Sequence, residues 1–304
     1  MIGLLVMAYG GPDRIEDVEP YILDVRNHRP TAPALIAEMR ARYARIGGRS
    51  PILERTRAQA SALENALLGM GIDCRAWTGM RHWHPYIGDT LRSMEAADVR
   101  RAVGLVMAPH FSRMSIGAYV QKVQEAKTGI EVRVIASWHL MQEYLATVLE
   151  LVERAARRFP EPVRARVPVV FTAHSLPERI LGEGDPYATQ FAETVEALRA
   201  KLDGRACHAA WQSAAHTGEP WLGPDAAAIL DNLAAAGEKN VIIAPIGFTC
   251  EHVEILYDVD IEYREHAASV GMRMERIDML NDHPLMMRGL AVRIRDEARR
   301  AGWV

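Results

Sequence analysis

The chain has 304 residues, enough for one large core or two modest ones, and 49% of its residues are hydrophobic. Its 36 basic and 39 acidic residues give a net charge of −3, which argues against a nucleic-acid-binding protein. Its three cysteines are widely separated, which excludes a disulfide framework and a zinc ribbon and favours a reducing compartment, the cytoplasm. The short apolar start, residues 2–7, predicts a buried strand rather than a signal peptide. No apolar run is long enough for a membrane span, so we expect no stable membrane insertion.

Short apolar segments alternate with longer amphipathic segments along the whole chain. We expect strands at residues 3–9, 74–80, 102–109, 132–137, 169–174, 207–213, 241–248 and 272–277, and helices at 51–68, 116–127, 139–158, 187–201, 224–236 and 283–301. Strands this apolar are typical of an α/β fold with parallel sheets covered by helices on both faces.

The two halves of the chain resemble each other faintly. Residues 5–12 and 169–177 are both apolar strands that lead to a proline, and two further pairs of segments match in the same order. We therefore expect two similar Rossmann-like lobes, 1–160 and 161–304, with the last helix packing back on the first lobe; chance similarity between strands is the alternative. In a duplicated fold, Tyr9 and His174 would occupy matching strand ends and face each other across a cleft that holds a flat ligand.

His174 is the strongest candidate for chemistry. It ends an apolar strand, and open parallel sheets bind ligands at the carboxyl ends of their strands. A neutral imidazole there can bind a metal or accept a proton. The alternative is a histidine that only hydrogen-bonds a loop. The neighbouring Ser175 does not form a hydrolase site with it, because successive side chains of a strand point to opposite faces.

Three carboxylates follow at regular spacing later in the chain. Glu254, Asp258 and Glu262 lie four residues apart in a predicted helix that begins near Glu251, which gives a row roughly 12 Å long on one face. Such a row attracts a divalent cation and could pass it towards His174. The alternative is a solvated acidic stripe.

Two other segments carry polar residues outside the repeating strand–helix pattern. Arg26 and Arg42 lie in an insertion at about residues 12–50, where arginines could bind carboxylates; they could equally be ordinary surface residues. His82 and His84 alternate in an extended segment, which is compatible with a metal loop or with the wall of a binding site.

Several of these blocks resemble the signature blocks of ferrochelatases, in the same order. They are Phe-Thr-Ala-His-Ser-Leu-Pro at 171–177, Trp-Gln-Ser at 211–213, Pro-Trp-Leu-Gly-Pro at 220–224, Pro-Ile-Gly-Phe at 245–248 and His-Val-Glu-Ile-Leu-Tyr-Asp at 252–258. The start, Leu-Leu-Val-Met-Ala-Tyr-Gly at 4–10, is similar to the coproporphyrin-type enzymes, whereas protoporphyrin-type members carry an asparagine there.

The resemblance implies roles for individual residues. His174 and Glu254 would bind iron and take the pyrrole protons on one face of the porphyrin, and Tyr9 would bind the inserted iron on the other. Asp258 and Glu262 would continue the acidic row and hold a second hydrated divalent cation. The implied porphyrin-binding residues are Tyr9, Arg26, Arg42, Ser50, Gln59, Tyr119 and Trp221.

The implied activity is a lyase reaction of heme biosynthesis, the insertion of Fe²⁺ into coproporphyrin III to give iron coproporphyrin III. The alternatives are a protoporphyrin IX ferrochelatase, a chelatase for another metal, and a non-catalytic tetrapyrrole carrier. Apart from porphyrin and iron we expect only transient contacts with neighbouring heme-pathway enzymes. No cysteine follows Cys250, so we expect no [2Fe–2S] cluster. Arg81 replaces a family lysine, and Gly11 replaces a threonine, which we expect to loosen the loop after Tyr9.

Overall fold

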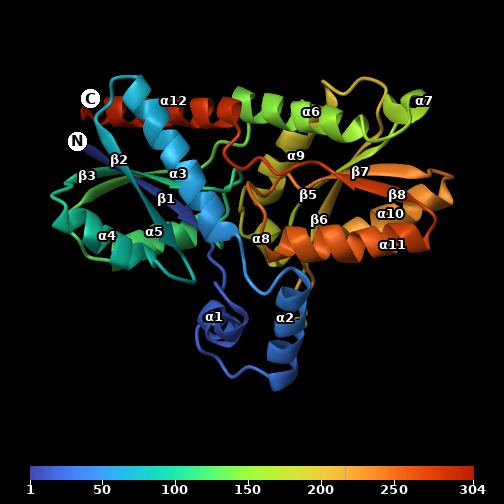
Figure 1. Ribbon diagram of the computed structural model, residues 1–304, viewed down its shortest axis with the longest axis horizontal. Coiled ribbons are helices and arrows are strands. Elements are labelled where there is room, and N and C mark those ends of the chain that lie inside the picture. Colours follow the sequence, from blue (N-terminus) through green and yellow to red (C-terminus); the bar gives the residue numbers. More distant parts are fainter. Residues whose placement is uncertain (216) are drawn as a thin grey trace. The chain divides into compact units, whose positions relative to one another are not determined.

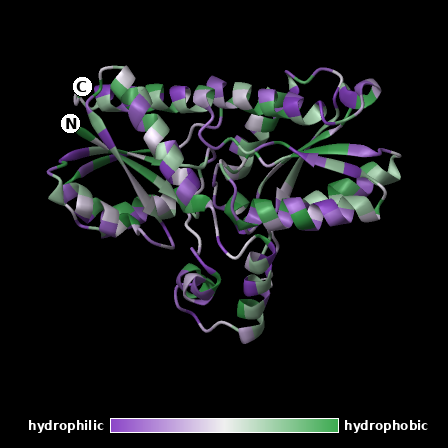
Figure 2. Ribbon diagram, in the orientation of Figure 1, coloured by the Kyte–Doolittle hydropathy of each residue, from purple (hydrophilic) through white to green (hydrophobic). Residues whose placement is uncertain are grey.

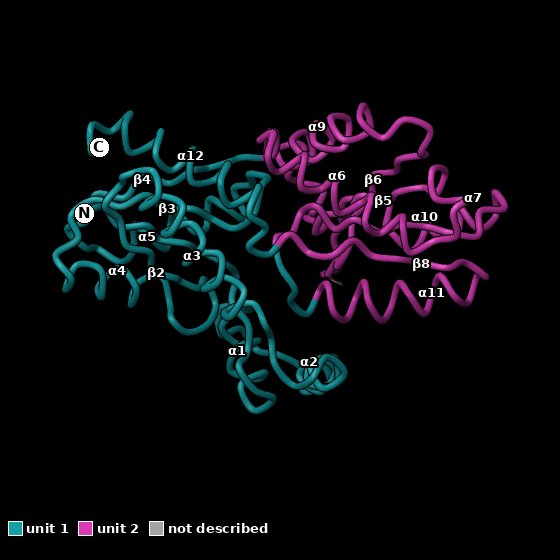
Figure 3. The backbone as a smooth tube through the Cα atoms, turned by 45° about the horizontal axis from the view of Figure 1, so that its top comes forward, with its two compact units in different colours: residues 1–138, 250–253, 281–304 teal, residues 139–249, 254–280 magenta. Residues whose placement is uncertain are grey.

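The computed structural model describes residues 1–215 and 217–304. The chain forms two compact units (Figure 3). Unit 1 comprises residues 1–138, 250–253 and 281–304, and unit 2 comprises residues 139–249 and 254–280. All eight segments predicted as strands form strands, four in each unit.

Unit 1 is built on a parallel sheet with the strand order β2-β1-β3-β4 (Figure 1). Its strands are β1 (Ile2–Ala8), β2 (Cys74–Met80), β3 (Arg101–Val106) and β4 (Glu131–Ile135). Helices α3 (Ile52–Gly69) and α12 (Pro284–Arg300) pack together on one face. Helices α4 (Ile87–Ala96) and α5 (Ile116–Glu125) cover the other (Figure 1). The sheet is therefore buried on both sides, which explains its apolar strands.

An insertion between β1 and α3 stands away from the sheet of unit 1 (Figure 1). It contains the short helix η1 (Ile15–Asp17), α1 (Val18–Val25) and α2 (Pro33–Arg45). Residues Tyr21 and Tyr43 of these helices pack with Trp83, which follows β2, in a small apolar core.

Unit 2 repeats the strand order as β6-β5-β7-β8, again all parallel. Its strands are β5 (Val169–His174), β6 (Cys207–Gln212), β7 (Asn240–Ala244) and β8 (Arg273–Arg276). On one face pack α6 (Gln142–Ala156) and α9 (Tyr187–Arg199), and on the other α10 (Ala226–Ala235) and α11 (Arg264–Ser269). The short helices α7 (Glu161–Arg164) and α8 (Arg179–Gly182) lie in connections. Helices carry hydrophilic and hydrophobic residues along their length, as the two-faced packing requires (Figure 2).

The boundary predicted between residues 160 and 161 lies inside unit 2. Helix α6 precedes that boundary, but it packs on β7 and β8 of the second sheet. Helix α12 belongs to unit 1, where it contacts α3, β3 and β4.

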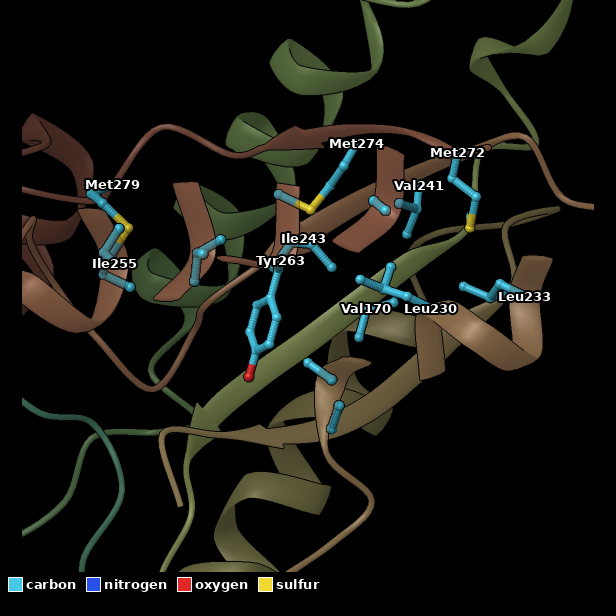
Figure 4. Close-up of a cluster of buried hydrophobic side chains, with 14 residues drawn as sticks. Val170, Leu230, Leu233, Val241, Ile243, Ile255, Tyr263, Met272, Met274 and Met279 are labelled. Carbon is cyan, nitrogen blue, oxygen red and sulfur yellow. The ribbon is translucent and has the colours of Figure 1, made fainter. Parts of the chain in front are cut away.

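The acidic segment departs from the helix that its spacing predicts. Residues Glu254–Tyr263 form a π-helix, η2, which runs into α11, whereas Glu251 lies outside any helix. The apolar row Ile255, Val259 and Tyr263 is buried in the core of unit 2 with residues of the sheet and α10. Figure 4 shows Ile255 and Tyr263 in this cluster. The carboxylates lie one residue before each of these anchors, so the packing of η2 fixes where the acidic row points.

Candidate active site

His174 lies at the carboxyl end of β5, directly opposite Gln212 of β6. The Tyr187 hydroxyl donates to the His174 carbonyl at 2.9 Å. The Nδ1 atom contacts the carbonyl oxygen of Ser175, which can only accept, so Nδ1 carries a proton. Its other nitrogen, Nε2, lies 3.5 Å from Oε1 of Glu254. The structure thus brings together the two residues that the sequence singled out for catalysis.

The surroundings of His174 favour its protonated form, whereas the sequence alone suggested a neutral imidazole. Burial opposes protonation, but the carboxylates of Glu254 and Asp258 and the Ser175 carbonyl outweigh it and raise the pKa of His174 to about 9. At neutral pH the His174–Glu254 pair therefore holds a proton before any substrate arrives. A third of the His174 side-chain surface remains exposed, so the imidazole is accessible to a ligand.

Two polar residues at the end of β6 hold the start of η2. The Gln212 side chain is fully buried; its amide donates to the Glu254 carbonyl at 3.0 Å and its oxygen accepts from the Thr172 hydroxyl at 2.7 Å. The Ser213 hydroxyl donates to the carboxylate of Asp258, which is itself buried. Sequence reasoning quoted Gln212 and Ser213 only as part of a motif and assigned them no role. A glutamine next to a tryptophan at the end of a predicted strand was the available signal.

The third carboxylate of the row has a different setting. Glu262 is half-buried and, with Asp225 and Asp258, raises the pKa of the buried Tyr263 phenol, to which burial contributes most. The indole of Trp221 lies beside His174, with ring centroids 6.4 Å apart, and its nitrogen donates to Thr217. Across residues 1–215 and 217–304, no three histidine, cysteine or acidic side chains are grouped closely enough to hold a metal ion by themselves.

Tyr9 follows β1 in unit 1 and is 38% exposed. Its ring packs against the imidazole of His82, with centroids 4.7 Å apart, and the Arg81 guanidinium lies 5.7 Å from the ring centre. The same guanidinium lies 5.6 Å from the ring of Tyr119, which is buried. Two of the proposed porphyrin-binding residues of unit 1 are therefore linked through one arginine.

The loop after Tyr9 is tighter than the sequence comparison suggested. A Cβ atom at Gly11 would lie 2.6 Å from Cβ of Ser50, and one at Gly10, where φ is +96°, would lie 3.0 Å from the Trp83 nitrogen. Close packing, rather than looseness, accounts for glycine at position 11.

The remaining candidates also lie in unit 1. Arg26 is exposed and donates to the Thr31 hydroxyl, and Arg42 donates to Glu38 within α2. Ser50 is buried. Gln59 is fully buried and donates to the Asn281 carbonyl at 3.0 Å.

Comparison with known proteins decides the family. A family model described as Ferrochelatase matches residues 1–298. The chain belongs to the ferrochelatase family. It is 39% identical to the ferrochelatase of Herpetosiphon aurantiacus, over 92% of this chain and 94% of that protein. It is 37% identical to the coproporphyrin III ferrochelatase of Geobacillus kaustophilus, over 95% of this chain and 93% of that protein.

This ferrochelatase also shares its fold with chelatases of solved structure. SirB from Bacillus subtilis with Fe³⁺ aligns with a TM-score of 0.57 at 11% identity, covering 99% of this chain and 98% of that one. As a member of its family, the protein is an enzyme that inserts a metal into a porphyrin. Among its described residues, no helix is long and apolar enough to cross a membrane.

Proposed function

We propose that this ferrochelatase inserts Fe²⁺ into coproporphyrin III, with release of two protons. The His174–Glu254 pair, 3.5 Å apart at a strand end, is the observation that carries the proposal. Support for the substrate comes from relatives named coproporphyrin III ferrochelatase, at 35–37% identity, and from the tyrosine at position 9. Coproporphyrin III carries four propionates, and the guanidinium groups of Arg26 and Arg42 are suited to bind carboxylates.

The chemistry requires a metal ligand and a base at the same place. A free-base porphyrin has two pyrrole N–H groups, and both protons must leave as its four nitrogens bind Fe²⁺. In our proposal Glu254 attracts the cation, whose charge then opposes the protonated state of His174. His174 releases its proton to solvent, and the neutral imidazole accepts the first pyrrole proton. After passing that proton to solvent, it accepts the second. Glu254 and Asp258 compensate the positive charge during this exchange.

Other residues have supporting roles in the proposal. Tyr9 binds the inserted iron through its phenol oxygen, and Ser50, Gln59, Tyr119 and Trp221 contribute to porphyrin binding. Asp258 and Glu262 bind a second hydrated divalent cation. We further propose that the protein has no [2Fe–2S] cluster, acts in the cytoplasm and makes transient contacts with neighbouring heme-pathway enzymes.

An anaerobic assay tests the substrate. Purified protein at catalytic concentration is mixed with Fe²⁺ and either coproporphyrin III or protoporphyrin IX, and the loss of free-base fluorescence is followed. We expect many turnovers with coproporphyrin III and a kcat/KM at least about tenfold lower with protoporphyrin IX, since each lost carboxylate contact is worth about 1.4 kcal/mol or more. Preference for protoporphyrin IX would contradict the assignment, and quenching that stops at one porphyrin per protein would indicate a carrier.

A further inference from the structure

A carboxylate and an imidazole from two different elements form a pair beside Tyr9. Asp24 lies on α1 in the insertion, and its Oδ2 is 2.9 Å from Nδ1 of His82 in the loop after β2. The backbone N–H of His82 donates to the Tyr9 carbonyl at 2.9 Å, and the His82 ring packs on the Tyr9 ring at an angle of 51°. Asp24 therefore contacts the residue whose ring supports Tyr9.

The hydrogen bond to Asp24 determines how the His82 ring is oriented. His82 is only 5% exposed. A carboxylate oxygen only accepts, so Nδ1 of His82 carries a proton and donates it to Asp24. The buried Nε2 atom has no hydrogen-bond partner among the described residues. Asp24 thus provides the polar contact that fixes the imidazole plane.

The insertion reaches the Tyr9 segment at a second point. The Tyr21 hydroxyl, three residues before Asp24 on α1, donates to the Gly10 carbonyl at 3.2 Å. Tyr21 also packs edge-on against Trp83, the neighbour of His82. Helix α1 therefore holds both the residue after Tyr9 and the ring against which Tyr9 packs.

We propose that Asp24 is a positioning residue for Tyr9: it orients the ring of His82, and that ring sets the direction of the Tyr9 phenol. The inference rests on the proposed role of Tyr9 as a ligand of the inserted iron. Mutation of a residue that orients a metal ligand without binding the metal itself typically changes metal affinity or activity by about 10- to 100-fold.

A double-mutant cycle distinguishes positioning from mere support of the fold. The dissociation constant and the visible absorption spectrum of bound iron coproporphyrin III are measured for the wild type, Tyr9→Phe, Asp24→Ala and the double variant. We expect Asp24→Ala to weaken binding about 10- to 100-fold and to shift the spectrum when Tyr9 is present. In the Tyr9→Phe background the same substitution should change binding less than about twofold, since the oriented oxygen is already gone.

Two further variants complete the design. Asp24→Asn keeps an oxygen that accepts from Nδ1 and should restore wild-type binding. Tyr86→Phe is the matched control, because it removes the other hydrogen bond to the same carboxylate, at 3.4 Å, and should leave binding unchanged. If Asp24→Ala does not fold, His82→Phe replaces it, since it keeps a ring against Tyr9 but lacks the bond to Asp24.

The outcomes separate the inference from the proposed function. Equal losses from Asp24→Ala in both backgrounds, or an unchanged spectrum in the Tyr9 background, would overturn the positioning role alone. An unchanged spectrum for Tyr9→Phe would overturn the ligand role of Tyr9, and the positioning role with it.

Discussion

The surroundings of His174 contain groups that favour a positive charge on its ring, while burial opposes that charge. Glu254 and Asp258 on η2 and the carbonyl of Ser175 favour the imidazolium, while burial opposes it. The Tyr187 hydroxyl on α9 donates to the His174 carbonyl, and burial raises the pKa of this phenol, which stays neutral. The pKa of about 9 therefore depends on the two carboxylates and on the Ser175 carbonyl, with Glu254 the largest of these. The imidazole becomes a base only when it has lost this proton.

Replacing Glu254 should move the pH dependence of insertion. Without its charge, burial dominates and the pKa of His174 falls in Glu254→Gln. The neutral form acts in the free enzyme, so kcat/KM rises with pH through this pKa, and in the variant the rise occurs at lower pH. The plateau should drop about 10²- to 10⁴-fold, since the acid–base partner is lost. If kcat/KM of Glu254→Gln rose over the same pH range as that of the wild type, Glu254 would not set the pKa of His174.

The matched control is Glu262→Gln, the same substitution two turns along η2. The largest contributions to the pKa of His174 come from burial, Glu254, the Ser175 carbonyl and Asp258, so removing the charge of Glu262 should leave the rising limb close to its wild-type position. The His174 pKa can be read independently from its NMR titration in both variants.

At the scale of elements, Gln212 connects β5, β6 and η2. In Gln212→Leu the Thr172 hydroxyl and the Glu254 carbonyl lose their partners in a buried place. Each buried polar group left unpaired costs about 1–3 kcal/mol. The free energy of unfolding, measured with urea, should therefore fall by that amount or more. Gln121→Leu is the control, because Gln121 is exposed and donates to the exposed Glu125. Its free energy of unfolding should fall by no more than about 0.5 kcal/mol. Equal stability of the two variants would contradict the connecting role.

The close approach at Gly11 gives a second stability prediction. Gly11→Ala should lower the free energy of unfolding by about 1–3 kcal/mol, because its methyl group overlaps Ser50. Ser50→Gly should recover most of that loss in the double variant. Gly69→Ala, with no atom within 4 Å of the added carbon, should not destabilise the protein. A neutral Gly11→Ala would show that the loop has room.

The elements were predictable to different degrees, for physical reasons. Buried parallel strands are continuous apolar runs, so 169–174 was predicted with its observed bounds, while β7 ends at Ala244 because Pro245 cannot donate to a neighbouring strand. The π-helix was missed because α- and π-helices both keep residues four apart on nearly one face. Helices α1 and α2 were not predicted, because Pro20 and Pro33 lie in their first turns. A proline there interrupts the apolar pattern without breaking the helix.

At the scale of the whole molecule, the sequence predicts two similar lobes with the last helix on the first, but not that residues 250–253 belong to unit 1. Long-range contacts place these residues, together with α12, in unit 1. Arg55 of α3 lies 3.0 Å from the Glu251 carboxylate, and Asn281 donates to the same carboxylate at 3.2 Å. Pairings between residues so far apart leave no local pattern. The same limit applies to Gln212 and Asp24, whose roles depend on partners from distant segments.

The proposed function depends most on His174 as the group that exchanges protons and metal. Its direct test is the anaerobic insertion assay with His174→Ala, alongside the affinity for free-base coproporphyrin III. His139→Ala is the matched control, because His139 pairs with Glu193 at 2.8 Å elsewhere in unit 2. We expect His174→Ala to bind porphyrin with near wild-type affinity and to lose at least about 10²-fold in kcat, while His139→Ala keeps wild-type turnover. Turnover by His174→Ala within about twofold of the wild type would contradict the central claim.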